Sequence, residues 1–79
     1  MLVIEGIVVS VMETWPLQLV IQQGAIRYDV SLSESVDVKA GGVQVGVAVI
    51  RPGARVTVFG ERRSGGSVVA STVLVRSPP

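Results

Sequence analysis

The side chains that could do acid–base chemistry in this chain are six carboxylates, because it contains no histidine and no cysteine. They are Glu5, Glu13, Asp29, Glu34, Asp37 and Glu61. All fall in turns or at outward strand positions, where a solvated carboxylate is the ordinary state. No histidine is present to activate a serine, and the only lysine, Lys39, precedes a Gly-Gly turn. The sequence therefore predicts a protein that is not an enzyme and needs no metal or cofactor.

A second group of residues could bind a ligand rather than transform one. Trp15 stands in the first turn, and Arg62 and Arg63 precede a Ser-Gly-Gly-Ser loop. Aromatic rings stack on nucleic-acid bases, and guanidinium groups contact phosphates and aromatic faces. With Arg27 and Phe59 at outward strand positions, these residues predict a site for single-stranded nucleic acid or another anionic polymer.

Each of these residues also has an ordinary structural interpretation. Trp15 would cap the end of a barrel, and Arg62 and Arg63 would be solubilising charges. Arg27 would face a carboxylate on a neighbouring strand, and Phe59 would lie in a subunit interface. The net charge of only +1 supplies no long-range field to attract nucleic acid or an anionic membrane. Both interpretations stay open from the sequence.

The composition predicts the elements that must position these residues. Eighteen valines, five isoleucines and three threonines make up a third of the 79 residues. Side chains branched at Cβ favour strands, so the fold class is all-β. We expect strands at residues 2–12, 17–22, 26–32, 55–63 and 68–75. Inside the first, Gly6 indicates a bend or bulge, and a second bulge near Val9 and Ser10 would turn Val11 inward.

Finer features of these strands are also predicted by their patterns. Val56 and Val58 would face inward, with Thr57 and Phe59 outward. A bulge near residues 70–71 leaves open whether Val68 or its neighbour faces inward. Residues 36–45 read as a short hairpin around a Gly-Gly turn, and residues 47–50 as one helical turn that plugs the barrel end.

Five strands with short connections, and an irregular piece between the third and fourth, are the element order of an OB-like Greek-key barrel. We expect one such domain at residues 1–76, with an extra hairpin or irregular segment between strands three and four. Residues 77–79 would form a disordered tail. An SH3-like barrel and a small β-sandwich are the alternatives.

The valines between the third and fourth main strands predict self-association. With 48% hydrophobic residues, so short a chain carries more apolar surface than one small barrel easily buries. The hairpin backbone offers groups for pairing with another strand. The candidate interface of a homo-oligomer is Val36, Val38, Val43, Val45 and Val47. The alternative is that this hairpin folds over the barrel mouth and fills it.

Two later segments resemble those of small uncharacterised bacterial OB-fold domains. Residues 51–60 carry Pro-Gly-x-x-Val-x-Val-x-Gly, and residues 66–75 carry Gly-x-x-x-Ala-x-x-Val-x-Val. Residues 6–11 are similar to the first strand of the same domains, whereas residues 33–50 depart from their pattern. The resemblance covers about two thirds of the chain. It implies the fold and a tendency toward ligand or nucleic-acid binding, and it supplies no catalytic residues.

The chain shows no targeting or membrane-spanning pattern. Its first residues lack a basic region, and Glu5 interrupts the apolar run that follows Met1. The longest stretch without charge, residues 14–26, is too short and too polar to cross a bilayer. We therefore expect a cytoplasmic protein with no membrane partner.

Overall fold

The computed structural model describes residues 1–78 and contains six strands and one short 3-10 helix. The elements are β1 (Leu2–Met12), β2 (Gln18–Gln23), β3 (Ile26–Ala40), β4 (Val43–Gln44), η1 (Val47–Val49), β5 (Arg55–Arg62) and β6 (Val68–Ser77). The predicted strands are all present. Their limits agree with prediction within two residues, except that β3 continues to Ala40.

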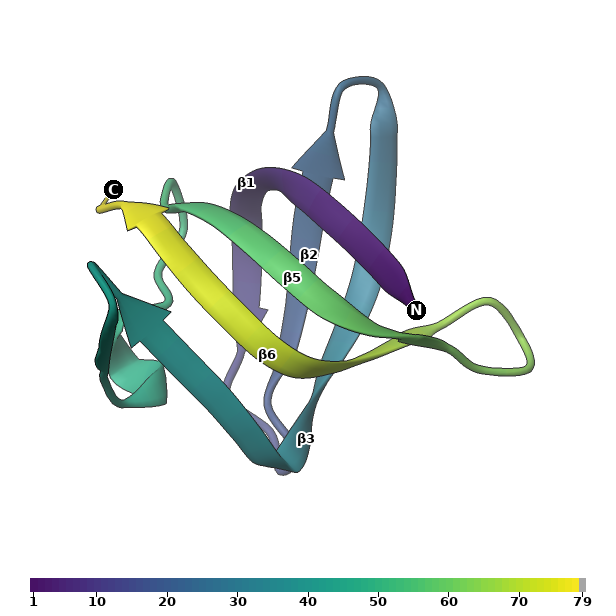
Figure 1. Cartoon of the computed structure of the whole chain (residues 1–79). Coiled ribbons are helices and arrows are strands. Elements are labelled where there is room, and N and C mark those ends of the chain that lie inside the picture. Colours follow the sequence, from purple (N-terminus) through teal and green to yellow (C-terminus); the bar gives the residue numbers. More distant parts are fainter. Residues whose placement is uncertain (79) are drawn as a thin grey trace.

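The strands close into one barrel (Figure 1). Around the ring, β1 pairs with β2, β2 with β3, β3 with β6, β6 with β5, and β5 with β1. The β3–β6 pair is parallel and the other pairs are antiparallel. The ring is therefore a closed, mixed, five-stranded barrel, and β4 is an extra strand beside β3. This confirms the OB-like prediction, and a single closed ring excludes a two-sheet sandwich.

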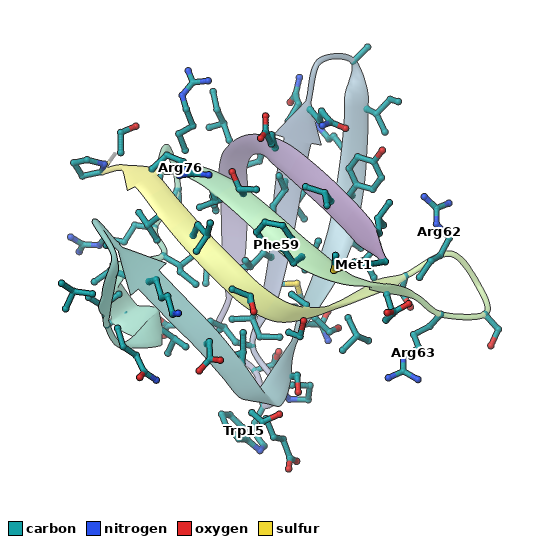
Figure 2. All side chains as sticks on the ribbon, viewed as in Figure 1. Met1, Trp15, Phe59, Arg62, Arg63 and Arg76 are labelled. Atoms are coloured by element: carbon teal, nitrogen blue, oxygen red, sulfur yellow. The ribbon has the colours of Figure 1, made fainter. Side chains whose placement is uncertain are left out.

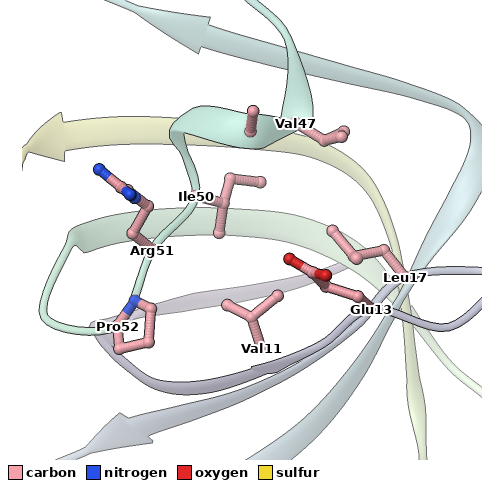
Figure 3. A pocket seen from close by; sticks show the side chains of 8 residues that line it. Val11, Glu13, Leu17, Val47, Ile50, Arg51 and Pro52 are labelled. Carbon is pink, nitrogen blue, oxygen red and sulfur yellow. The ribbon is translucent and has the colours of Figure 1, made fainter.

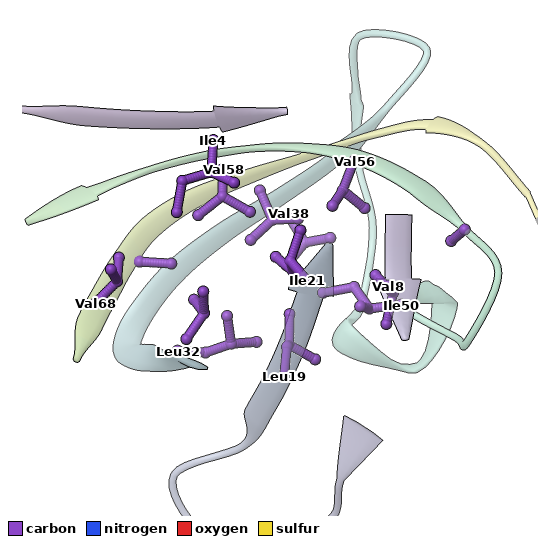
Figure 4. Close-up of a cluster of buried hydrophobic side chains, with 14 residues drawn as sticks. Ile4, Val8, Leu19, Ile21, Leu32, Val38, Ile50, Val56, Val58 and Val68 are labelled. Carbon is purple, nitrogen blue, oxygen red and sulfur yellow. The ribbon is translucent and has the colours of Figure 1, made fainter. Parts of the chain in front are cut away.

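The inside of the barrel is lined by aliphatic side chains (Figure 4). Ten of the fourteen buried hydrophobic residues are valine or isoleucine. They are Ile4, Val8, Leu19, Ile21, Val30, Leu32, Val38, Ile50, Ala54, Val56, Val58, Val68, Ala70 and Val73. None of the chain's three aromatic residues is among them. The short, stiff side chains fill the narrow interior, so the aromatic rings lie outside it.

Two bulges set which side chains face inward, as predicted. The β1–β2 register shifts between Val8 and Ser10, and Val11 packs against the core beyond this point. The β5–β6 register shifts opposite Ser71. Val68 is buried, which settles the ambiguity left by the sequence.

Thr57 and Phe59 lie on the outward side of β5, as predicted, but neither is fully exposed. Thr57 points away from the barrel interior but is only 3% exposed. The Nε of Arg76 donates a hydrogen bond to its hydroxyl at 3.2 Å. Phe59 is half-buried on the same side, between Val3 of β1 and Thr72 of β6 in the strand register. Neighbouring side chains therefore cover part of this outer face.

Strand β3 makes a sharp corner, visible in Figure 1. Its pairing with β6 stops at Leu32 and resumes at Asp37. Within this corner, the Ser35 backbone N–H donates to the Ser33 hydroxyl at 3.2 Å. The irregular segment that the sequence placed after the third strand is thus a bend within one long strand, and the second half of β3 forms the predicted hairpin with β4.

The hairpin and the following turn have the predicted character. Gly41 and Gly42 both have positive φ values, 60° and 80°, as the two central residues of a type I′ hairpin turn require. Helix η1 is a single turn, and Ile50 directly after it is buried in the core. At the C-terminus, Ser77 of β6 still pairs with Arg55 of β5. Strand β6 therefore runs into the segment that was expected to be a tail. Pro79 of that segment lies outside the described residues.

Candidate binding surface at the barrel end

Three segments that are distant in the sequence meet at one end of the barrel. They are the β1–β2 loop, the corner of β3 and the connection that contains η1. The loop is attached to β3 where the Leu32 N–H donates to the Leu17 carbonyl at 2.9 Å. A proline after Trp15 ends the strand pattern there, and the Trp15–Pro16 peptide is cis. At this end Ile50, directly after the single helical turn η1, is buried in the core, whereas the residues of η1 itself are exposed.

Two neighbouring cavities open at this end and share Glu13, Leu17 and Val47 as lining residues. The first has a volume of about 360 Å³ and is mainly apolar. Its lining is Glu13, Thr14, Trp15, Leu17, Leu32, Ser33, Glu34, Val36 and Val47. We call this space the corner cavity.

The second cavity has a volume of about 480 Å³ and lies between η1 and β1 (Figure 3). Besides the shared residues, its lining is Val11, Ala48, Ile50, Arg51 and Pro52. Figure 3 shows Glu13 and Leu17 on one side of this space and Val47 and Ile50 on the other. The two cavities together form a surface that we call the barrel-end groove.

Two large apolar side chains in the lining of the barrel-end groove face solvent, and two more are exposed on the elements beside it. Trp15 is 79% exposed and Val47 is 43% exposed, although both line the corner cavity. Met12, at the end of β1, is 51% exposed, and Val49 of η1 is 37% exposed. Scattered apolar residues are normal on protein surfaces, but exposed apolar residues that line a cavity, as Trp15 and Val47 do, are typical of a binding site.

The charges at the groove are unevenly placed. The corner cavity has two carboxylates in its lining, Glu13 and Glu34, and no basic side chain. The single base of the groove, Arg51, lines the second cavity. Apolar walls with acidic groups at the opening favour a ligand that carries an apolar group next to a positive charge.

The structure does not bring the predicted nucleic-acid residues together. Trp15, Phe59 and the pair Arg62 and Arg63 are well separated in Figure 2. Arg27 pairs with Gln22 near the far end of β2, whereas Trp15 precedes the start of that strand. Only the β1–β2 loop and the β5–β6 loop come near a common strand, β3. The first contacts β3 at Leu32, and β6, which follows the second, begins beside Val30 of β3. No single face therefore holds all five residues.

The predicted interface valines divide into three groups. Val38 is only 2% exposed and belongs to the barrel core, so its side chain cannot contact a second copy while the barrel is folded. Val36 and Val45 are half-buried and pack against the core. Val43 and Val47 are exposed, at 64% and 43%. The hairpin thus both covers the barrel and leaves apolar side chains in solvent.

Sequence reasoning missed the roles of Glu13 and Glu34 as neighbours of one cavity. It treated both only as solvated carboxylates, and both are indeed exposed. Glu13 lies close to Trp15 in the sequence, which was a usable signal. Glu34 reaches the cavity only through the corner of β3, for which the sequence gives no glycine or proline as a marker.

A second, polar surface lies elsewhere, around the buried hydroxyl of Thr57. The cavity there measures about 520 Å³ and is lined by Glu5, Gly6, Arg55, Val56, Thr57 and Arg76. Among residues 1–78, no three acidic side chains gather as they would around a metal ion. Within the same described part of the chain, no helix has the length and apolar character needed to cross a membrane.

Comparison with known proteins identifies no relative: no family model, curated protein or solved structure matches this chain.

Proposed function

We propose that this chain is a small, non-catalytic β-barrel binding module, and that it associates with further copies of itself through the barrel-end groove. The observation that carries this proposal is the exposure of Trp15 and Val47 around a mainly apolar cavity. Apolar surface of this kind is stabilised when another surface covers it and removes it from water. The resemblance to small bacterial OB-fold domains, and a cytoplasmic location, belong to the same proposal.

The lack of a catalytic role is supported by the surroundings of the carboxylates. All six are solvent-exposed. Catalytic acids and bases are generally set in clefts, where burial or a charged neighbour adjusts their proton affinity. Glu5, Glu13 and Glu34 do line cavities, but all three remain exposed to solvent and none is buried there.

The substitution Val47→Asp tests self-association. A charge placed at the wall of the corner cavity should weaken association by about tenfold or more, because it would have to be buried in the complex. The measurement is the dissociation constant from sedimentation equilibrium. Val3→Asp is the matched control, since Val3 is similarly exposed at 45% and lies on β1 beside Phe59, outside the groove. Equal effects of the two substitutions would argue against the groove as the contact surface.

Single-stranded nucleic-acid binding is a second candidate function. The exposure of Trp15 favours it, because a ring that is 79% exposed is free to stack on a base and does not cap the core. Arg62 ends β5 and Arg63 begins the loop to β6, and both are exposed. The first residue of β6, Val68, is in register with Val30 of β3, the strand that the β1–β2 loop contacts. The separation of these residues across the surface supports only a few simultaneous contacts.

Fluorescence of Trp15, the only tryptophan, tests this second function directly. Binding of oligo-dT should quench the emission, and affinity should fall with salt with a log–log slope of roughly −2 if about three phosphates are neutralised. Trp15→Ala should then cost about 1–3 kcal/mol of binding free energy. Emission that does not change on adding the oligonucleotide at low salt would remove this candidate and leave the self-association proposal unaffected.

A further inference from the structure

The hairpin between β2 and β3 projects from the barrel at the end opposite to the β1–β2 loop (Figure 1). Its turn is held by a hydrogen bond of 3.0 Å from the Gln22 side-chain amide to the Gly24 carbonyl, and Gly24 takes a φ of 61°. Three exposed side chains follow, which we call the hairpin tip: Ala25, Ile26 and Arg27.

The hairpin tip combines an apolar group with a neighbouring positive charge. Ile26 is 55% exposed although isoleucine is among the most buried residue types in proteins. Arg27 follows it directly and is also exposed. Because this turn is hydrogen-bonded and short, its backbone has little conformational freedom left to lose on binding.

The corner cavity has the complementary properties. Its walls are mainly aliphatic, and Glu13 and Glu34 are the charged groups in its lining. A volume of about 360 Å³ is at the low end of the range for ligand sites, so it suits one or two aliphatic side chains. Ile26 and Arg27 are successive residues of β3, so their side chains point to opposite faces of the hairpin. A tip that enters end-on would place Ile26 against the apolar wall and Arg27 toward a carboxylate at the opening.

We infer that the hairpin tip of one copy docks in the corner cavity of another, so that the barrels associate head to tail. This inference rests on the proposed self-association and specifies its geometry. The tip and the cavity lie at opposite ends of β2, a strand of six residues or about 20 Å. Two copies that pair in this way leave one free tip and one free cavity, so the contact is heterologous and continues into a ring or a filament.

The edge of β4 is a weaker alternative for assembly. It is the edge strand of the sheet and would allow pairing between two copies through the backbone. However, β4 contains only two residues, Val43 and Gln44, and so short an edge offers few hydrogen bonds. The hairpin tip and the corner cavity are complementary in apolar character and in charge, which the edge of β4 does not provide.

Mixing two variants tests the head-to-tail geometry. Ile26→Asp inactivates the tip, and Val47→Asp inactivates the cavity, so each variant alone should be a monomer of 8.3 kDa. In a mixture, the intact tip of one variant meets the intact cavity of the other. Light scattering should then show a 1:1 complex with twice the 8.3 kDa mass, which cannot grow further. Far-UV circular dichroism of each variant confirms that the barrel is folded.

The outcomes separate this inference from the proposed function. If the wild-type protein self-associates but the mixed variants stay monomeric, the head-to-tail contact is wrong and the self-association proposal survives. If the wild-type protein is itself monomeric at high concentration, the proposed function fails as well. A blue shift of Trp15 emission on mixing would further support the inference, because Trp15 lines the cavity that the tip enters.

A charge exchange provides a second test that does not depend on the aspartate variants folding. Arg27→Glu and Glu34→Arg should each weaken association several-fold, because each places like charges at the contact. Both changes in one chain restore opposite charges across every interface, so association should recover toward the wild-type value. A double variant that is as weak as the worse single variant would contradict the pairing.

Discussion

Gly6 and Gly60 are the two strand residues where the absence of a side chain matters most. A Cβ atom on Gly6 would collide with the backbone carbonyl oxygen of Gln22, and one on Gly60 with that of Val69. Gly6 stands where β1 leaves β5 and begins to pair with β2, since Ile7 is in register with both neighbours. The close approach therefore belongs to the turn of the barrel wall, and the bend expected at Gly6 from the sequence has this physical origin.

The substitution Gly6→Ala should lower the free energy of unfolding by about 1–3 kcal/mol, because the atom it meets is backbone and cannot rotate away. Gly46→Ala is the matched control. Gly46 has a φ of −81°, and an added Cβ meets nothing within 4 Å. Alanine there should stabilise the protein by about 0.4–1 kcal/mol through the unfolded chain. Urea unfolding, monitored by circular dichroism, measures the free energy of unfolding of both variants. Equal changes in the two variants would show that the close approach at Gly6 does not restrict a side chain there.

The connection between β3 and β5 shows what the sequence could predict about elements. The Gly-Gly turn, the short hairpin and the helical turn before Ile50 all follow recognisable patterns, and all are present. The corner within β3 was not predicted as part of one strand. Strand limits are normally read from glycine and proline, and the corner from Ser33 to Val36 contains neither. Its serine hydrogen bonds supply the turn instead.

The pairing of strands also explains why some valines of the hairpin are buried and others are exposed. The alternation of apolar and polar residues does not show which of these valines are buried: Val36, Val38, Val43 and Val45. The observed parallel pairing of β3 with β6 sets Val38 opposite Val73, and both are in the core. Val43 is left on the far side of the two-residue strand β4, where no further strand covers it. The register between distant strands therefore decides what the local pattern leaves open.

At the scale of the whole molecule, the closed barrel was predictable and the barrel-end groove was not. The order of the strands and the frequency of valine can be read along the sequence without knowing any long-range contact, and they indicate an OB-like barrel. The groove is formed by loop 13–17, the β3 corner and the segment around η1, which meet only when the barrel closes. Trp15 and Val47 were each singled out by the sequence, but for two different sites; the structure places both at one cavity.

We propose that the exposed apolar barrel end is a contact surface between copies of this chain. The most direct test is the weight-average mass of the wild-type protein, measured by light scattering across a dilution series. If copies associate through this surface, the mass should exceed 8.3 kDa at high concentration and fall toward that value on dilution. A constant mass of 8.3 kDa up to millimolar concentration would contradict it.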